Sequence, residues 1–537
     1  MSGFVQRGGS WPIVMLARNR PAMLSKTLRS LLAVKGVSRD DITVSVHGAD
    51  SGVLNVLKSF EIDYFQNTDL GSSYGAPWEK GARRIAQHYK YTLSTMFKRM
   101  ADPTHPRTKQ APALVVVEDD LLFAHDFMDY LLAAAPVLDV DPTVWCISAW
   151  NDNGFKGLVK DSLRLKRTGF FPGLGWLISR KVWEGELEEG WPDQHWDHWL
   201  RDAKRHKGRD CITPEVPRTY HNGIKGTFMD LSTHNKYFAN IALNDGQSFG
   251  SSFFNWQHQL HGTTTGGVTG VPVQLPETVA LAVKGRYVAR LDALLHAGQY
   301  VGGAHDIDAG LGEGGETKGE AVLGGSVGSG SGSQSAVAQV GQQPELPSLV
   351  VCFRFNIKSD NNGFKPLASY LGIWHEPQRT AFHGIHELYV QGRHIILVNT
   401  DNSVGNDLAR HCEGHPTLSP GDFRGVAAPR ARPQVRVAFE AVAGEQKGDS
   451  CIAVCETKSM DCTEDAGAVY AINTCTALSK VFPCPREKCK RSEGSDQPVF
   501  EPAENTCLWS SGSFPFKCEA SHHATRRLCP CTARQRR

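Results

Sequence analysis

Three consecutive acidic residues follow one of the most apolar stretches of the chain. Segment 113–120, ALVVVEDD, places five apolar residues directly before Glu118, Asp119 and Asp120. Such a run is typical of a buried parallel strand. Carboxylates are ligands for Mg²⁺ or Mn²⁺, usually together with phosphate oxygens. The pattern predicts either a site for a cation and a nucleotide diphosphate or a solvated strand end. A Walker B strand would look similar, but the chain has no G-x-x-x-x-G-K-[ST] loop.

The elements around these acids alternate between strand-like and helix-like patterns. Strands are expected at 12–17, 42–46, 113–117 and 144–150, and helices at 21–33 and 79–100. The longer helix carries Ile85, Tyr89, Leu93 and Met96 on one stripe. This alternation predicts a Rossmann-like α/β fold with a mostly parallel sheet, in which ligands bind beyond the carboxyl ends of the strands. Both Arg20 and the three acids follow such ends.

Length and composition limit the number of domains and the kinds of partner that the chain can have. The 537 residues allow two to four domains, and we expect 12–245 to form the main α/β domain and 246–304 a connecting segment. The Gly/Ser-rich residues 305–347 are expected to be a disordered linker, followed by a small α+β unit at 348–400. The net charge of +2 gives no indication of a nucleic-acid partner. No apolar stretch approaches the roughly 18 residues of a membrane helix, so membrane association is expected only through an anchor not visible in this chain.

The cysteines are concentrated at the end of the chain. Ten of the 14 lie between Cys451 and Cys531, which predicts a disulfide-rich module at 434–537 and an oxidising compartment. Zinc is the alternative, but the C-x3-C, C-x4-C and C-x-C spacings do not form the paired C-x2-C pattern of a zinc site.

An ordered set of motifs resembles one enzyme family. The segments VVVEDDL, VWCISAWNDNG, FFPGLGWLISRKVW and WDHW resemble the β-1,2-N-acetylglucosaminyltransferases, over about 12–237. Residues 271–300 and 349–399 resemble the family more weakly. The module resembles the C-terminal cysteine-rich segment of N-acetylglucosaminyltransferase V. The first resemblance implies a GT-A nucleotide-diphospho-sugar transferase fold, a Mn²⁺ ion and UDP-GlcNAc as donor.

The resemblance also assigns roles to individual residues. Asp120 matches the metal ligand, Asp119 and Glu118 match donor contacts, and Asp197 matches the catalytic base. Arg20 and His88 match nucleotide contacts, and Cys146 and Cys211 match a disulfide. The chemistry is suitable, because a carboxylate can deprotonate the acceptor hydroxyl and a guanidinium binds phosphate well.

Each role has a structural alternative. Arg20 could cap a strand–helix turn, His88 could be a structural histidine, and Asp197 could be a solvated acid on an aromatic face. Cys146 and Cys211 could be two buried thiols. His195 and His198 flank Asp197 and could bind a metal, although nothing else completes a His/Cys set.

The sequence departs from the family pattern at two places. Where the family has an Asp for the uracil, His47 aligns and Asp50 follows three residues later, so either could contact the base. Where N-acetylglucosaminyltransferase I has a donor-binding Ser, Phe228 aligns beside Thr227. Thr227 is therefore a further candidate for donor binding.

The implied function is inverting transfer of GlcNAc to O2 of an α-mannose on glycoproteins. We expect an α-1,3-mannosyl-glycoprotein 2-β-N-acetylglucosaminyltransferase of N-glycan maturation in the Golgi lumen or at its membrane. One alternative is a protein O-mannose β-1,2-N-acetylglucosaminyltransferase, which segments 17–38 and 371–374 resemble more. Another is a non-catalytic glycan-binding protein on a transferase fold.

Overall fold

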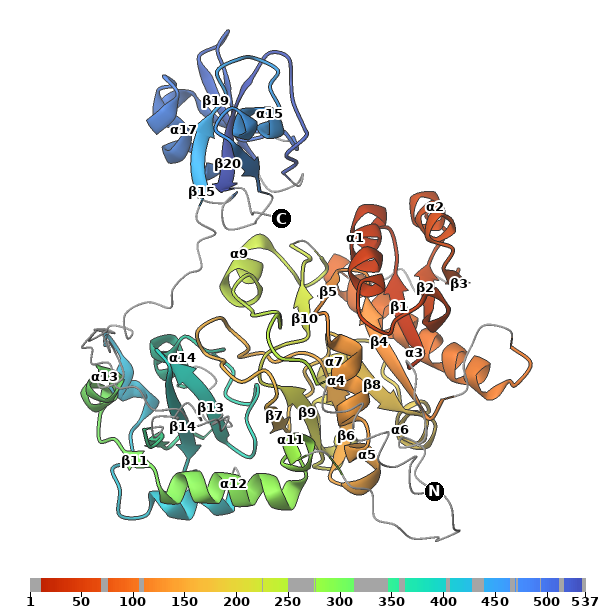
Figure 1. The fold of residues 1–537 in the computed structure, drawn as a ribbon, viewed down its shortest axis with the longest axis vertical. Coiled ribbons are helices and arrows are strands. Elements are labelled where there is room, and N and C mark those ends of the chain that lie inside the picture. Colours follow the sequence, from red (N-terminus) through yellow and green to blue (C-terminus); the bar gives the residue numbers. More distant parts are fainter. Residues whose placement is uncertain are drawn as a thin grey trace, which may run out of the picture. The chain divides into compact units, whose positions relative to one another are not determined.

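The computed structural model describes most of the chain in two compact units (Figure 1). It covers residues 11–68, 76–105, 111–224, 226–249, 275, 277–312, 346–356, 363–401, 406–426, 439–463, 469, 472–492, 494–510 and 516–533. One unit comprises Met1–Tyr220 with Ala242–Arg432, and the other His221–Ile241 with Pro433–Arg537. Each unit is described on its own.

An eight-stranded sheet forms the core of the first unit, in the order β3-β2-β1-β4-β8-β6-β9-β7. Its strands are β1 (Ile13–Ala17), β2 (Ile42–His47), β3 (Asp63–Asn67), β4 (Ala113–Glu118), β6 (Val144–Ser148), β7 (Leu165–Thr168), β8 (Trp176–Ser179) and β9 (Asp210–Pro214). Strands β8 and β7 run antiparallel to their neighbours, and the other pairs are parallel. The expected α/β fold with a mostly parallel sheet is confirmed.

Helices pack on this sheet through apolar stripes. They are α1 (Pro21–Leu32), α2 (Ser51–Phe60), α3 (Pro77–Ala101), α4 (Phe127–Ala134), α5 (Val137–Val140), α6 (Arg180–Val182), α7 (Trp196–Leu200) and α8 (Ala203–His206), with a π-helical turn at Trp183–Leu187. Helix α1 starts at a proline, which the first helical turn tolerates, and buries Leu24, Leu28 and Leu31. Two short strands, β5 (Leu121–Phe123) and β10 (Thr219–His221), lie outside the main sheet.

A second sheet in the same unit has the order β11-β12-β14-β13. Its strands are β11 (Gln299–Tyr300), β12 (Leu349–Phe353), β13 (Ile385–Val390) and β14 (Arg393–Asn399). The same part of the chain contains the helices α11 (Glu277–Ala280), α12 (Lys284–His296), α13 (Ala304–Gly312) and α14 (Lys365–Leu371), and 3-10 turns at Asp407–Cys412 and Pro420–Phe423. Strands β13 and β14 form a hairpin, and its turn residues Gln391 and Gly392 both have positive φ, as a type I′ turn requires.

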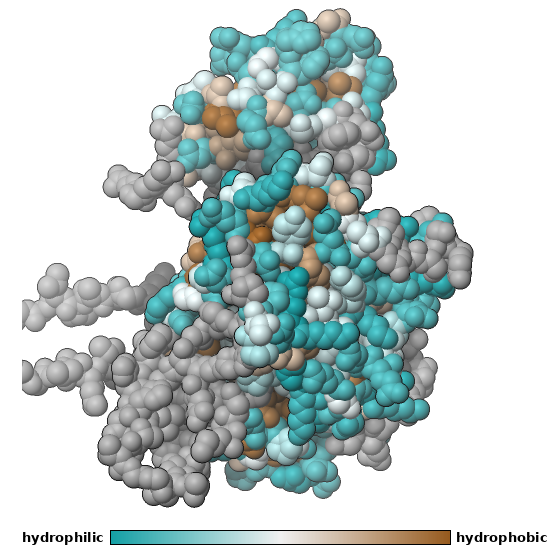
Figure 2. Space-filling view, turned by 90° about the vertical axis from the view of Figure 1, so that its right-hand side faces the viewer, coloured by the Kyte–Doolittle hydropathy of each residue, from teal (hydrophilic) through white to brown (hydrophobic). Residues whose placement is uncertain are grey.

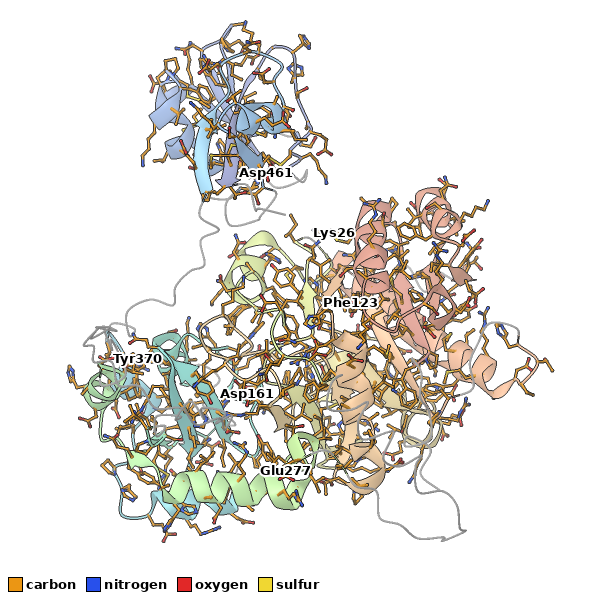
Figure 3. The ribbon with its side chains drawn as sticks, viewed as in Figure 1. Lys26, Phe123, Asp161, Glu277, Tyr370 and Asp461 are labelled. Atoms are coloured by element: carbon orange, nitrogen blue, oxygen red, sulfur yellow. A yellow bond between two sulfur atoms is a disulfide. The ribbon has the colours of Figure 1, made fainter. Side chains whose placement is uncertain are left out.

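Two helices beside this sheet lie in ranges that were expected to connect larger units. The supposed connecting segment contains α12, which buries Tyr287, Leu291 and Leu295 against the sheet. The supposed linker begins inside α13, where Ile307 and Leu311 are buried. The hydroxyl of Tyr370 in α14, the residue labelled in Figure 3, donates to Asp308 Oδ1 of α13 at 2.8 Å. The helix forms because these apolar side chains recur at helical spacing despite the flanking glycines. The rest of the predicted linker, 313–345, lies outside the described residues.

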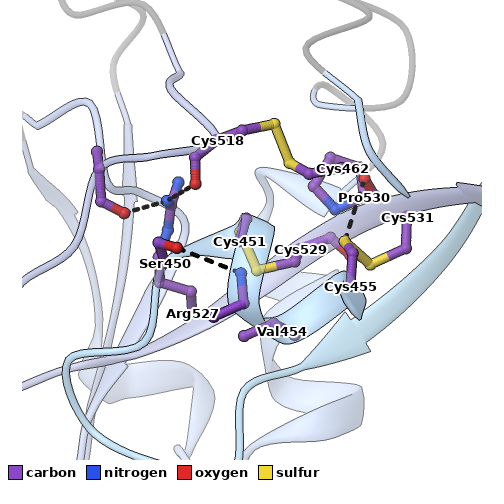
Figure 4. Close-up of a disulfide and its surroundings, with 12 residues drawn as sticks. Ser450, Cys451, Val454, Cys455, Cys462, Cys518, Arg527, Cys529, Pro530 and Cys531 are labelled. Atoms are coloured by element: carbon purple, nitrogen blue, oxygen red, sulfur yellow. Dashed lines mark hydrogen bonds between the residues drawn. A yellow bond between two sulfur atoms is a disulfide. The ribbon is translucent and has the colours of Figure 1, made fainter. Parts of the chain in front are cut away.

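The second unit is built around disulfides. It contains α9 (Leu231–Thr233), a π-helical turn at His234–Phe238, α15 (Cys451–Glu456), α17 (Cys475–Val481) and a 3-10 turn at Arg486–Lys488, with strands β15 (Phe439–Ala443), β16 (Met460–Cys462), β17 (Cys489–Ser492), β18 (Val499–Glu501), β19 (Thr506–Ser510) and β20 (Arg526–Ala533). All ten cysteines of the module form disulfides rather than a zinc site, in the pairs 451–529, 455–531, 462–518, 475–489 and 484–507. Figure 4 shows three of these bridges beside α15 and β20.

The surface is mainly hydrophilic on the face shown in Figure 2, where hydrophobic residues form only small patches. Within the described ranges, no helix has both the length and the apolar character needed to span a bilayer.

Candidate donor and catalytic site

Adjacent strands bring Arg20 and the three acids together. Strand β1 pairs in parallel with β4, with Leu16 opposite Glu118, so both strands end at the same edge of the sheet. Arg20 follows β1 at the start of α1, and Asp119 and Asp120 follow β4. The Asp119 backbone N–H donates to the Leu16 carbonyl at 3.1 Å, which holds the two strand ends in register.

The guanidinium of Arg20 bridges two of the acids. Its Nη1 donates to Asp120 Oδ2 at 2.8 Å, and its Nη2 donates to Asp119 Oδ1. Burial opposes the charge of Arg20, but the two carboxylates outweigh it and raise the pKa of Arg20 above its ordinary value. Arg20 still keeps about a third of its side chain exposed, at 34%. It can therefore present its remaining surface to a ligand while the acids fix its orientation.

The remaining acid, Glu118, is held by a tyrosine. The Tyr89 hydroxyl of α3 donates to Glu118 Oε1 at 2.8 Å. Burial, followed by the charge of Asp120, raises the pKa of Glu118 to about 7. Burial also raises the pKa of Asp119 to about 6, although Arg20 opposes this shift. Burial and the charge of Glu118 raise the pKa of Tyr89 well above its usual value, so the hydroxyl keeps its proton.

The carboxylates fit a divalent cation. Three acids lie near a single guanidinium, which bonds only Asp119 and Asp120, so the cluster concentrates negative charge that a cation would offset. Asp119 Oδ2 is buried and accepts no hydrogen bond among the described residues, which leaves an oxygen suited to a hard cation or a ligand hydroxyl. In the described ranges, no three His, Cys, Asp or Glu side chains form a ready metal cage. One or two carboxylates with phosphate oxygens are sufficient for ions of the Mg²⁺ type.

Two histidines lie together beside the strand end of β2. His47 ends β2 and His88 lies on α3, both are 5% exposed, and their ring centroids are 5.0 Å apart. His88 Nε2 shares a hydrogen bond of 2.9 Å with Ser45 Oγ. Burial, followed by the charge of His47, lowers the pKa of His88 to about 3, so its imidazole is neutral near pH 7.

Asp50 has a structural role at this edge. Its Oδ1 accepts a hydrogen bond from the Val53 backbone N–H at 2.9 Å and caps α2. Contact with a uracil stays a prediction for both His47 and Asp50. Thr227 and Phe228 belong to the second unit, and Phe228 is 58% exposed.

Asp197 lies in the short helix α7, and an arginine holds its carboxylate. Arg201 Nη1 contacts Asp197 Oδ2 at 2.8 Å, and Arg201 Nε donates to the Phe171 carbonyl at 3.1 Å. Burial lowers the pKa of Arg201. The residue before the helix, His195, adopts a left-handed conformation with φ 52°, which turns the chain sharply into α7. Sequence reasoning missed Arg201, although its i,i+4 spacing from Asp197 was a usable signal.

Aromatic stacking connects Asp197 to the acids. Trp196, next to Asp197, stacks on Tyr89 with ring centroids 3.9 Å apart and planes inclined at 27°. Tyr89 therefore contacts both Glu118 and the helix that carries Asp197. Sequence reasoning placed Tyr89 on a buried stripe but missed this hydroxyl.

Two disulfides strengthen the first unit. Cys146 of β6 lies opposite Cys211 of β9, and the two are bonded, which is the pairing that the resemblance implied. Cys352 and Cys412 form a second bridge between β12 and the 3-10 turn at 407–412. The sequence analysis did not assign this pair, although these were the last two cysteines left over.

Comparisons with known proteins show that the region of this site is similar to a protein family. The model of the GNT-I family matches residues 5–256. An alpha-1,3-mannosyl-glycoprotein 2-beta-N-acetylglucosaminyltransferase from Arabidopsis thaliana is 37% identical over 247 residues, which is 44% of this chain. The chain spans 53% of that relative's length.

Two solved structures show a weaker likeness. A mannosyltransferase from Pyrobaculum calidifontis in complex with GDP-Man and Mn²⁺ is 15% identical, with a TM-score of 0.25, over 58% of this chain and 84% of that chain. A CMP:2-keto-3-deoxy-manno-octonic acid synthetase complexed with CTP is 13% identical, with a TM-score of 0.23, over 38% and 89%. Scores this low carry no argument about function. The sequence match, in contrast, covers the strands, the acids and Asp197 together, since residues 5–256 match the model of the GNT-I family.

Proposed function

We propose that the chain is an inverting glycosyltransferase that moves GlcNAc from UDP-GlcNAc to O2 of an α-mannose on a glycoprotein. Its acceptor is the α-1,3-linked mannose of an N-glycan. One observation carries the proposal: Tyr89 joins the acids at the end of β4 to the helix of Asp197, through its hydrogen bond to Glu118 and its stack on Trp196. A donor site and a base on adjoining elements are what a single displacement needs.

The residues take distinct roles in this proposal. Asp197, oriented by Arg201, removes the proton from the acceptor hydroxyl, whose oxygen attacks the anomeric carbon as UDP leaves from the opposite face. Glu118 and Asp119 bind hydroxyls of the donor, and Arg20 faces the diphosphate. His47 and His88 border the uracil. A Mn²⁺ ion held by Asp120 would offset the negative charge that the leaving diphosphate gains.

The seven disulfides support a place in an oxidising compartment. We therefore place the reaction in the Golgi lumen, with a mannose-bearing glycoprotein as the partner. The same lumen would hold both the donor and the maturing N-glycan acceptor.

The test is transfer by the purified full chain with UDP-GlcNAc and Mn²⁺. An oligomannose N-glycan and an O-mannosyl peptide are offered separately, so that the preferred product identifies the acceptor class. Asp197→Asn should abolish transfer and keep UDP binding. Asp193→Asn is the matched control, because Asp193 is an exposed acid four residues earlier. Full activity of Asp197→Asn would refute the base assignment, and glycan binding without any turnover would favour a non-catalytic protein.

A further inference from the structure

An exposed tryptophan lies at the first turn of α3. Trp78 is 53% exposed, and it is one of the few large hydrophobic side chains that the described residues leave open to solvent. An indole is costly to leave in water, and exposed aromatic groups beside an active site commonly contact ligands. Its position relative to Asp197 shows which ligand it would meet.

Trp78 shares a helical face with Tyr89. The two residues are eleven positions apart, about three turns of an α-helix, so they point the same way. This face runs along the segment before Asp197, because Tyr89 stacks on Trp196 and the Ala86 carbonyl accepts a hydrogen bond of 2.9 Å from Trp191 Nε1. Trp78 extends this contact toward solvent.

The partner of Trp78 at this end is His195. Their ring centroids are 6.1 Å apart, with planes inclined at 34°. His195 stands two residues before Asp197, and its ring is in turn 5.9 Å from that of His198. The exposed indole thus lies next to the turn that carries the base. The helix positions of Trp78 and Tyr89 are about 16 Å apart along the axis of α3.

We propose that Trp78, with His195, determines acceptor specificity by packing against a pyranose ring of the glycan next to the mannose that is modified. This inference rests on the proposed function. The C–H face of a pyranose packs well on an indole, and a neighbouring imidazole can bond its hydroxyls. A platform two residues from the base suits the acceptor, whereas the donor is bound by the acids near Tyr89. Trp78 therefore selects branched glycans over isolated mannose.

The experiment compares Trp78→Ala, Trp78→Phe and Tyr91→Ala in the full chain. Tyr91 is the matched control, since it is an exposed aromatic on the opposite face of α3 that packs on Phe65. The acceptors are an oligomannose N-glycan and methyl α-mannoside. We expect Trp78→Ala to raise KM for the glycan about tenfold, and to leave KM for the methyl mannoside and for UDP-GlcNAc unchanged. In Trp78→Phe, the KM for the glycan should stay close to that of the wild type, because the phenyl ring keeps an aromatic face.

Other outcomes would overturn the inference. An unchanged KM for the glycan, or an equal effect on both acceptors, would exclude a platform for a neighbouring sugar. A lower Tm with weaker donor binding would show that Trp78 only packs α3 against α7. If the wild-type chain does not turn over UDP-GlcNAc, the proposed function fails, and calorimetric binding of the free glycan to wild type and Trp78→Ala decides this inference separately. Equal affinities in that assay would refute it.

Discussion

Tyr89 and Trp196 stack at 3.9 Å, so one side chain of α3 supports both halves of the proposed reaction site. The ring of Tyr89 positions the base helix, and its hydroxyl positions Glu118. Tyr89→Phe separates these two functions. A hydrogen bond to a charged group contributes about 1.5–3 kcal/mol, so loss of the hydroxyl should weaken UDP-GlcNAc binding by up to about a hundredfold. The variant should also lose some stability, because the bond is present in the free chain, but the retained ring should keep the stack on Trp196.

Calorimetric titration with UDP-GlcNAc measures this change. Tyr91→Phe is the control, because the Tyr91 hydroxyl donates to the Gln66 carbonyl on the far face of α3. Unaltered donor affinity in Tyr89→Phe would show that the hydrogen bond to Glu118 has no part in donor binding.

Arg201 should affect the chemical step more than binding. Lysine keeps the charge but cannot reach both Asp197 and the Phe171 carbonyl, as Arg201 does. We expect Arg201→Lys to lower kcat roughly tenfold with little change in KM for the donor, the pattern of a lost transition-state interaction. Initial-rate kinetics test this, with Arg205→Lys, an exposed arginine on α8, as control. A rise in donor KM at constant kcat would contradict the positioning role.

His88 should make the first unit less stable in acid. Its pKa is about 3 in the folded chain and about 6.5 when unfolded, so the unfolded state binds the proton first. The contribution of neutral His88 to the free energy of unfolding is therefore complete above about pH 6.5 and is lost as the pH falls toward 3. Between pH 6.5 and 5.5, the loss attributable to His88 approaches about 1 kcal/mol.

Urea unfolding at pH 7.5 and 5.5 tests this for wild type and His88→Gln, whose amide can replace the hydrogen bond to Ser45. The pH-dependent loss should be smaller in the variant. His296→Gln, at an exposed histidine of α12, should behave as wild type. Equal losses in all three proteins would show that His88 is not the group responsible.

Removal of the metal should weaken the binding of UDP and leave the fold of the chain largely intact. With EDTA, we expect transfer to stop and Mn²⁺ to restore it, and Asp120→Asn should bind UDP with the same affinity with or without Mn²⁺. Asp193→Asn should keep the wild-type response. Nucleotide binding by the wild type that does not respond to EDTA would refute the metal assignment. Circular dichroism checks that both units stay folded.

The bridge between Cys352 and Cys412 should stabilise the second sheet of the first unit. Disulfides usually contribute about 2–4 kcal/mol, so replacing both cysteines by alanine should lower the free energy of unfolding by about that amount. Removing Cys475–Cys489 in the second unit should leave the transition of the first unit unchanged. A double-alanine variant as stable as the wild type would contradict this.

The sequence predicted the elements whose signals are local. Pro21 and the stripe of Leu24, Leu28 and Leu31 locate α1, and the apolar run before Glu118 locates β4. The meeting of Arg20 with the acids followed from the general rule that parallel strands end at one edge. Helix α12 was not predicted, although its buried residues Tyr287, Leu291 and Leu295 recur at the i, i+4, i+8 spacing of an amphipathic helix.

Site details that depend on three-dimensional neighbours could not be predicted in the same way. From the sequence, Asp50 could either cap a helix or bind a ligand. Only the observed hydrogen bond from the Val53 backbone shows that it caps α2. The hydroxyl of Tyr89 reaches Glu118 across 29 positions of sequence, which no periodicity records.

The bridge between Cys146 and Cys211 gives the base helix an additional property. It encloses a span with a sequence separation of 65 residues, and that span contains Asp197. A protease that cuts once inside this ring leaves two fragments joined by sulfur, so the nicked chain migrates as one species until a reductant is added. Mechanical tension along the backbone would pass through the same bond and bypass the ring, which would keep the helix of Asp197 unloaded.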